Sequence, residues 1–142
     1  MSRGTRFPVI LAASLLLGML PGCGPTSDHP ATAPVRGKVT YRGRPVPKGM
    51  ITFVSDNGEA ASARIEPEGS YVLGTFGPAD GAVHGRHKVG IIADDGDPSL
   101  LPGAPGYRTP KVLVPKKYNN PETSGLSADV TKDGRAIDFD LK

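Results

Sequence analysis

The stretch Val35–Phe53, VRGKVTYRGRPVPKGMITF, decides the fold class. From Val35 to Tyr41, every second position is apolar or glycine, the period of a half-buried strand. Residues 42–49 contain three glycines or prolines before Gly49, a composition typical of a turn region. Residues 50–54 form the next apolar run, in which Ile51 and Phe53 lie at alternate positions. The stretch therefore predicts two short strands joined by a tight turn.

The same alternation recurs along the rest of the chain. The further runs are residues 60–66, 70–76, 85–92, 127–131 and 136–141. Turn signals separate them, including the Asn57-Gly58 pair, which favours a hairpin because both residues tolerate a positive φ. No segment keeps helical spacing over three turns. Seven short strands at such intervals predict an all-β chain folded as a seven-stranded β-sandwich.

Glycine and proline agree with this interpretation. The chain has 19 Gly and 15 Pro, which is 34 of 142 residues or 24%, close to the level of about 25–30% at which disorder is suspected. No Gly-X-Y period is present, which excludes a collagen-like rod. Because much of the Gly and Pro falls at turns between alternating runs, we interpret it as the connections of a small β fold. A helical bundle is disfavoured, since both residues are poor helix formers.

The N-terminus has the features of an export signal. Arg3 and Arg6 precede an apolar run at residues 9–20, which is of secretory length and shorter than the roughly 20 residues of a membrane span. The run ends in a tetrapeptide that resembles the lipobox of bacterial lipoproteins, Leu20, Pro21, Gly22 and Cys23. The resemblance implies that residues 1–22 are a lipoprotein signal peptide. It also implies that Cys23 carries a diacylglycerol and an N-acyl chain such as palmitate.

Residues 23–34 are expected to be a lipidated cysteine and a Pro-rich tether. The segment has no apolar periodicity, and its lone His29 carries no predicted role. Cleavage after residue 22 lowers Lys plus Arg from 17 to 15 against 14 Asp plus Glu, so the net charge falls from +3 to +1. Without a basic surplus, nucleic acid is not an expected partner.

Residues 35–142 resemble carboxypeptidase regulatory-like domains. The resemblance rests on the Val-x-Gly-x-Val opening at Val35–Val39, on the Gly-x-Pro-Val turn at Gly43–Val46, and on Glu68–Tyr71 and Gly85–Val89, with His87 in an aromatic slot. The tail at Val114–Leu126 is similar to that of small planctomycete lipoproteins with this domain. The resemblance implies a transthyretin (prealbumin)-like, seven-stranded Greek-key β-sandwich without catalytic chemistry.

Residues 94–111 are the exception to the strand pattern. This segment contains four prolines and exceeds the 12–15 residues beyond which loops are uncommon, often functional or disordered. A tolerated length variation is the favoured explanation, and Leu100, Leu101 and Tyr107 are the candidate partner contacts. Asp94, Asp95 and Asp97 suggest calcium, since hard cations prefer carboxylates. Their spacing does not fit an EF-hand, which favours a solvated acidic turn and no metal site.

Two further patterns bear on catalysis. His84 and His87 would face opposite sides of a strand, and the only Cys lies in the lipobox, so we expect surface or strand-edge histidines and not zinc ligands. Tyr41-Arg42-Gly43-Arg44 is similar to the Tyr-Arg-Gly-Ser of a transthyretin-like hydrolase that acts on 5-hydroxyisourate. That motif ends the hydrolase chain, whereas here it follows the first strand. The sequence therefore predicts no catalytic residues, no cofactor and no enzyme.

The expected function is that of an exported, membrane-anchored lipoprotein of the cell envelope. Gly24, in place of an inner-membrane retention Asp, favours the outer membrane. The domain is expected to be a non-enzymatic structural or binding module with the membrane, through Cys23, and an envelope protein or glycan as partners. The alternatives are a carbohydrate- or peptidoglycan-binding lipoprotein, which would need exposed aromatics in a chain with no Trp and four Tyr, and a transthyretin-like hydrolase.

Overall fold

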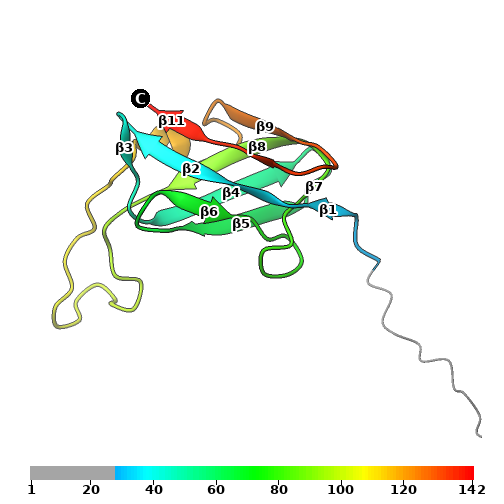
Figure 1. Cartoon of the computed structure of the whole chain (residues 1–142). Coiled ribbons are helices and arrows are strands. Elements are labelled where there is room, and N and C mark those ends of the chain that lie inside the picture. Colours follow the sequence, from blue (N-terminus) through cyan, green and yellow to red (C-terminus); the bar gives the residue numbers. More distant parts are fainter. Residues whose placement is uncertain (1–27) are drawn as a thin grey trace, which may run out of the picture.

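The computed structural model describes residues 28–142, and this part of the chain is all-β (Figure 1). The signal peptide, the lipobox residues Leu20, Pro21 and Gly22, and Cys23 lie outside the described residues. The strands are β1 (Thr32–Ala33), β2 (Val35–Tyr41), β3 (Arg44–Pro45), β4 (Gly49–Ser55), β5 (Ala60–Ile65), β6 (Ser70–Val72), β7 (Ala82–Val83), β8 (Gly85–Ile92), β9 (Leu126–Val130), β10 (Arg135–Ala136) and β11 (Phe139–Leu141), and a 3-10 helix, η1, spans Lys116–Tyr118.

The first sheet is built around β2. β6 and β3 pair with β2 in antiparallel fashion, whereas β10 and β11 pair with it in parallel, with Val39 opposite Phe139. The second sheet has the order β5-β4-β8-β9, and all of its pairs are antiparallel. β1 and β7 form a separate two-stranded pair. Residues 32 and 33, which the sequence assigned to the tether, therefore belong to the folded domain.

One face of each sheet is apolar and contributes to a single core. Alternate residues point inward because successive side chains of a strand lie on opposite faces. Fully buried members from the two sheets include Val35, Val39 and Leu141 on one side and Ile51, Phe53, Val89 and Ile91 on the other. The all-β prediction is confirmed, and the arrangement of the sheets is compatible with a β-sandwich.

The turn after β2 explains the Gly-x-Pro-Val pattern. Arg42 and Gly43 both have positive φ, 52° and 74°, as a two-residue hairpin that matches strand twist requires. The chain then returns, and the Val46 backbone N–H donates to the Val39 carbonyl at 3.0 Å. Val46 is buried. The turn therefore places the Val46 side chain in the core, next to β2.

The closest backbone approach in the first sheet lies at Gly37. A Cβ on Gly37 would lie 1.8 Å from the Ile137 carbonyl oxygen. That oxygen accepts a hydrogen bond from the hydroxyl of the buried Tyr71 at 2.6 Å, and burial raises the pKa of this hydroxyl. The neighbouring Asp138 carboxylate accepts the Lys38 backbone N–H at 2.8 Å. These contacts fix the segment between β10 and β11 against β2.

We predict that Tyr71→Phe and Gly37→Ala both destabilise the fold. Tyr71→Phe leaves a buried carbonyl without its donor and should cost about 1–3 kcal/mol. Gly37→Ala forces β2 away from Ile137 and should cost about 3 kcal/mol or more. Tyr41→Phe is the matched control and should change the free energy of unfolding by less than about 0.5 kcal/mol. Urea unfolding measures all three, and equal stability of Tyr71→Phe and Tyr41→Phe would contradict the assignment.

Candidate functional site

The long loop between Asp94 and Lys111 extends from the end of the domain opposite β1 (Figure 1). β8 leads into it, and its two ends are paired with each other. Asp94 and Val112 form an isolated antiparallel bridge, the Asp95 N–H donates to the Lys111 carbonyl at 3.0 Å, and the Leu113 N–H donates to the Ala93 carbonyl at 2.9 Å. The base of the loop is therefore a short extension of the strand ladder.

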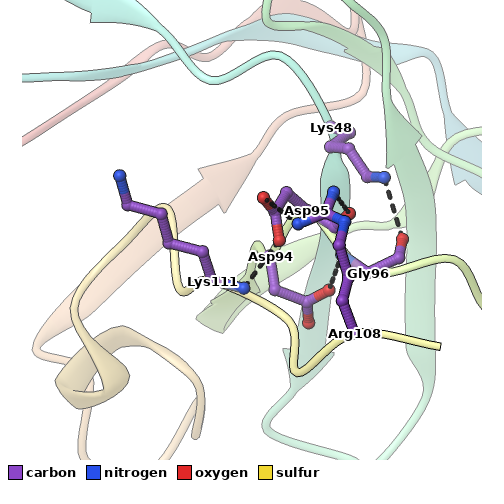
Figure 2. Close-up of polar contacts among 6 residues, drawn as sticks. All are labelled: Lys48, Asp94, Asp95, Gly96, Arg108 and Lys111. Atoms are coloured by element: carbon purple, nitrogen blue, oxygen red, sulfur yellow. Dashed lines mark hydrogen bonds and ion pairs between the residues drawn. The ribbon is translucent and has the colours of Figure 1, made fainter. Parts of the chain in front are cut away.

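Asp95 joins the two sides of the loop base, as Figure 2 shows. Its carboxylate accepts one hydrogen bond from Arg108 Nη1 at 2.8 Å and another from the Lys111 backbone N–H at 2.6 Å. Arg108 Nη2 also donates to the Asp95 carbonyl at 3.2 Å. The Arg108 side chain lowers the pKa of Asp95, and the carboxylate raises the pKa of Arg108. We call these contacts the loop clamp.

Lys48, from the turn region before β4, ties the loop to the body of the domain. Its Nζ donates to the Gly96 carbonyl at 2.8 Å (Figure 2). No pattern in the sequence predicts the roles of Lys48, Arg108 or Lys111. Opposite charges at Asp95 and Arg108, on the two sides of one loop, were the available signal. Lys48 is 48 residues from Gly96, and no local pattern connects them.

A groove of about 510 Å³ lies between Lys48 and the loop. Two of the three predicted partner contacts, Leu100 and Tyr107, line it, whereas Leu101 does not and is 73% exposed. The lining residues are Lys48, Asp95, Gly96, Asp97, Pro98, Leu100, Gly106, Tyr107 and Arg108. The groove thus combines two cations, two carboxylates and one aromatic ring.

The three acidic residues of the loop do not converge on one point. Asp94 accepts the Gly96 N–H at 2.9 Å, and Asp97 accepts the Ser99 N–H and hydroxyl at 2.9 and 2.6 Å. The Asp95 carboxylate belongs to the loop clamp. Each carboxylate therefore serves a separate contact, and residues 28–142 contain no group of three or more His, Cys, Asp or Glu that could hold a metal ion.

His87 corrects the expectation of two surface or strand-edge histidines. It is completely buried in β8, and its ring lies 5.9 Å from that of Phe53. Nδ1 lies 3.1 Å from the Gly85 carbonyl oxygen, while Nε2 has no hydrogen-bond partner among the described residues. His84 is only half-buried. The position of His87, on the same strand face as Val89 and Ile91, outweighs its polarity, because the alternation of the strand places it in the core.

The hydrolase-like tetrad Tyr41–Arg44 forms the hairpin turn between β2 and β3. Tyr41 and Arg44 are cross-strand partners, and Arg42 and Gly43 are the two turn residues. The Arg42 guanidinium carbon lies 5.2 Å from the Tyr41 ring centroid. These residues thus have a clear role in local structure.

We predict that Asp95→Ala opens the loop base. Trypsin should cleave after Arg108 severalfold faster, since the substitution removes both contacts that the carboxylate makes across the loop. Asp97→Ala is the matched control, because Asp97 bonds only to Ser99, and its cleavage rate should equal that of the wild type. The lowered pKa of Asp95 means that its contribution persists at neutral pH. It is lost only as the pH falls through the folded-state value, below 3.8. Equal cleavage of the two variants would contradict the clamp.

We predict that His87→Leu stabilises the protein. The substitution removes a buried nitrogen without a partner, whose burial costs about 1–3 kcal/mol, and keeps an apolar side chain of similar size against Phe53. The free energy of unfolding should rise by about 1 kcal/mol. The Gly85 carbonyl loses its contact but is at an exposed residue, where water replaces it. His84→Leu is the control, and a loss of stability in His87→Leu alone would show that Nε2 has a favourable partner.

Comparison of the chain with protein-family models, with curated proteins and with solved structures found no match. Among residues 28–142, no helix has both the length and the apolar character needed to cross a membrane. The resemblance to carboxypeptidase regulatory-like domains accordingly depends on the residues that carry it, from Val35–Val46, Glu68–Tyr71 and Gly85–Val89.

Proposed function

We propose that this chain is an exported, non-enzymatic lipoprotein that presents the Asp94–Lys111 loop as a binding element at the cell envelope. In this proposal Cys23 carries the lipid anchor, and residues 35–142 form a seven-stranded Greek-key sandwich of the carboxypeptidase regulatory-like, transthyretin-like type. The observation that carries the binding role is the loop clamp, because two of its residues, Asp95 and Arg108, line a groove of about 510 Å³.

The positions of β1 and the long loop at opposite ends of the domain support this arrangement. β1 lies at one end of the domain and the long loop extends from the other (Figure 1). A chain anchored at Cys23 enters the fold at β1, so the anchored end faces the membrane and the loop faces away from it. Residues 24–31, which separate Cys23 from β1, would span up to about 25 Å in extended form. The groove would then be accessible to a partner outside the membrane surface.

The structural positions of the hydrolase-like tetrad and of His87 support a non-enzymatic role. Tyr41–Arg44 are engaged in a hairpin turn, and His87 is enclosed in the core, out of reach of a substrate. General acid–base catalysis requires a group within hydrogen-bond distance of the proton that it transfers. We therefore propose that neither the tetrad nor His87 takes part in chemistry.

Envelope fractionation tests the two parts of this proposal. In detergent phase partitioning, the wild type should enter the detergent phase and Cys23→Ser the aqueous phase, because two acyl chains are enough for stable anchoring. Purified wild-type protein should also capture envelope material, and a variant with residues 97–107 replaced by a short Gly-Ser linker should not.

Three results would contradict the proposal. A Cys23→Ser variant that stays in the detergent phase would show that the anchor lies elsewhere. Equal capture by the wild type and the loop variant would show that the loop is not the binding element. Turnover of hydroxyisourate by the wild type, lost in Arg42→Ala, would show that the chain is an enzyme.

A further inference from the structure

The groove at the long loop has a lining that specifies a class of ligand. Two positively charged side chains, Lys48 and Arg108, and two negatively charged ones, Asp95 and Asp97, meet there with a net charge of zero. An anionic ligand would lie near both carboxylates, and a cationic one near both basic groups. A neutral ligand with several hydroxyl groups meets neither repulsion, since each hydroxyl both donates and accepts hydrogen bonds.

Hydrogen-bonding capacity remains on both kinds of group. Lys48 uses one of its three N–H donors on the Gly96 carbonyl, and Arg108 directs Nη1 and Nη2 to Asp95. Asp97 accepts both bonds from Ser99 through Oδ1. No hydrogen bond to Asp97 Oδ2 is found among the described residues. The groove lining can therefore both donate and accept hydrogen bonds.

The apolar part of the lining comes from Tyr107, Leu100 and Pro98. Tyr107 and Leu100 are half-buried, so part of each side chain stays accessible. An aromatic ring beside polar groups suits a ligand with one apolar face and a polar rim. A pyranose ring has this character, because its C–H bonds form an apolar face and its hydroxyls surround the edge.

Hydrogen bonds within the chain hold the base of the groove. Asp95, Arg108, Lys111 and Lys48 hold both ends of the loop through hydrogen bonds of 2.6–2.8 Å. Binding to fixed walls avoids much of the cost of ordering a loop. The volume of about 510 Å³ also lies within the range of about 300–1,000 Å³ that is usual for ligand sites.

We propose that this groove binds a neutral saccharide, with a sugar ring against Tyr107 and with its hydroxyls hydrogen-bonded to Asp97, Lys48 and Arg108. The proposal rests on the proposed function, since it names the ligand class for the same loop. It assigns recognition to the groove lining and no role to Leu101, which lies outside the groove.

Affinity electrophoresis of the full-length protein in non-ionic detergent tests this assignment. The gels contain dextran, glycogen or galactomannan as neutral polysaccharides, and polygalacturonate as an anionic one. At least one neutral polysaccharide should retard the wild type. Tyr107→Ala should weaken that retardation about tenfold, the equivalent of one good ring contact, while Tyr107→Phe should retain most of it.

Two further variants make the result specific. Phe76→Ala removes a partly exposed aromatic ring outside the groove and should not change retardation. Asp97→Ala removes a hydrogen-bond acceptor without loss of the loop clamp and should weaken retardation, which keeps the test informative if Tyr107→Ala does not fold. Equal effects of Phe76→Ala and Tyr107→Ala would overturn the assignment of the site.

The remaining outcomes separate the saccharide from the broader function. Retardation by polygalacturonate alone would overturn a neutral ligand. No retardation in any gel, together with loop-dependent capture of envelope material, would overturn the saccharide and leave the proposed function intact. Loss of both would refute the two proposals together.

Discussion

The carbonyl oxygen of Ile137 is the point at which the beginning and the end of the folded chain are joined. It approaches β2 where only Gly37 leaves room, and the Tyr71 hydroxyl satisfies it inside the core. The side-chain carboxylate of Asp138 secures the next position by accepting the Lys38 N–H. β10 and β11 can therefore both pair with the same strand, although the pairing is interrupted at Ile137 and Asp138. The first sheet depends on this join, because without it β2 loses its parallel neighbours.

The second sheet provides a different kind of support, which leads to the groove. Its four antiparallel strands are continuous, and β8 runs from the end near β1 to the base of the long loop. The ladder continues for a few residues past β8, through the pairing of Asp94 with Val112. Beyond this backbone pairing, the ion pair between Asp95 and Arg108 links the two sides of the loop. A rigid sheet thus ends in a rigid loop base.

Much of the second sheet could be predicted from the sequence, because its strands keep a period of two and a local hairpin connects β4 to β5. The same alternation places residue 87 on the inner face, whereas the polarity of histidine predicts a surface position. The first sheet was harder to predict. The run at residues 70–76 ends as a strand at Val72, because the chain then crosses from the first sheet to the second. The Leu73 N–H still donates to the Val35 carbonyl of the first sheet, whereas Gly74 exchanges backbone hydrogen bonds with Ser62 of the second. The run at residues 136–141 is divided at Ile137 by the contact with Gly37.

The candidate site was predictable only in part. Leu100 and Tyr107 were singled out from an irregular segment and do line the groove, whereas Lys48 reaches it from a different part of the chain. The acidic residues were recognised as a group, but their roles depend on donors up to 16 residues away, such as the Lys111 N–H. A sequence pattern gives the types of the residues and not their partners. Backbone geometry decides which carboxylate crosses the loop and which bonds only to a neighbour.

The parallel pairing of β2 with β10 and β11 also limits the order in which the chain can fold. Val39 lies opposite Phe139, so β2 gains its parallel neighbours from residues that lie 100 positions further along the sequence. A chain that emerges N-terminus first leaves one edge of β2 unpaired until residues 135–141 are available. Contacts of such sequence separation form slowly, and an unpaired edge exposes backbone donors and acceptors in the meantime. The complete first sheet thus requires residues 135–141, and a nascent chain that lacks them has no equivalent of it.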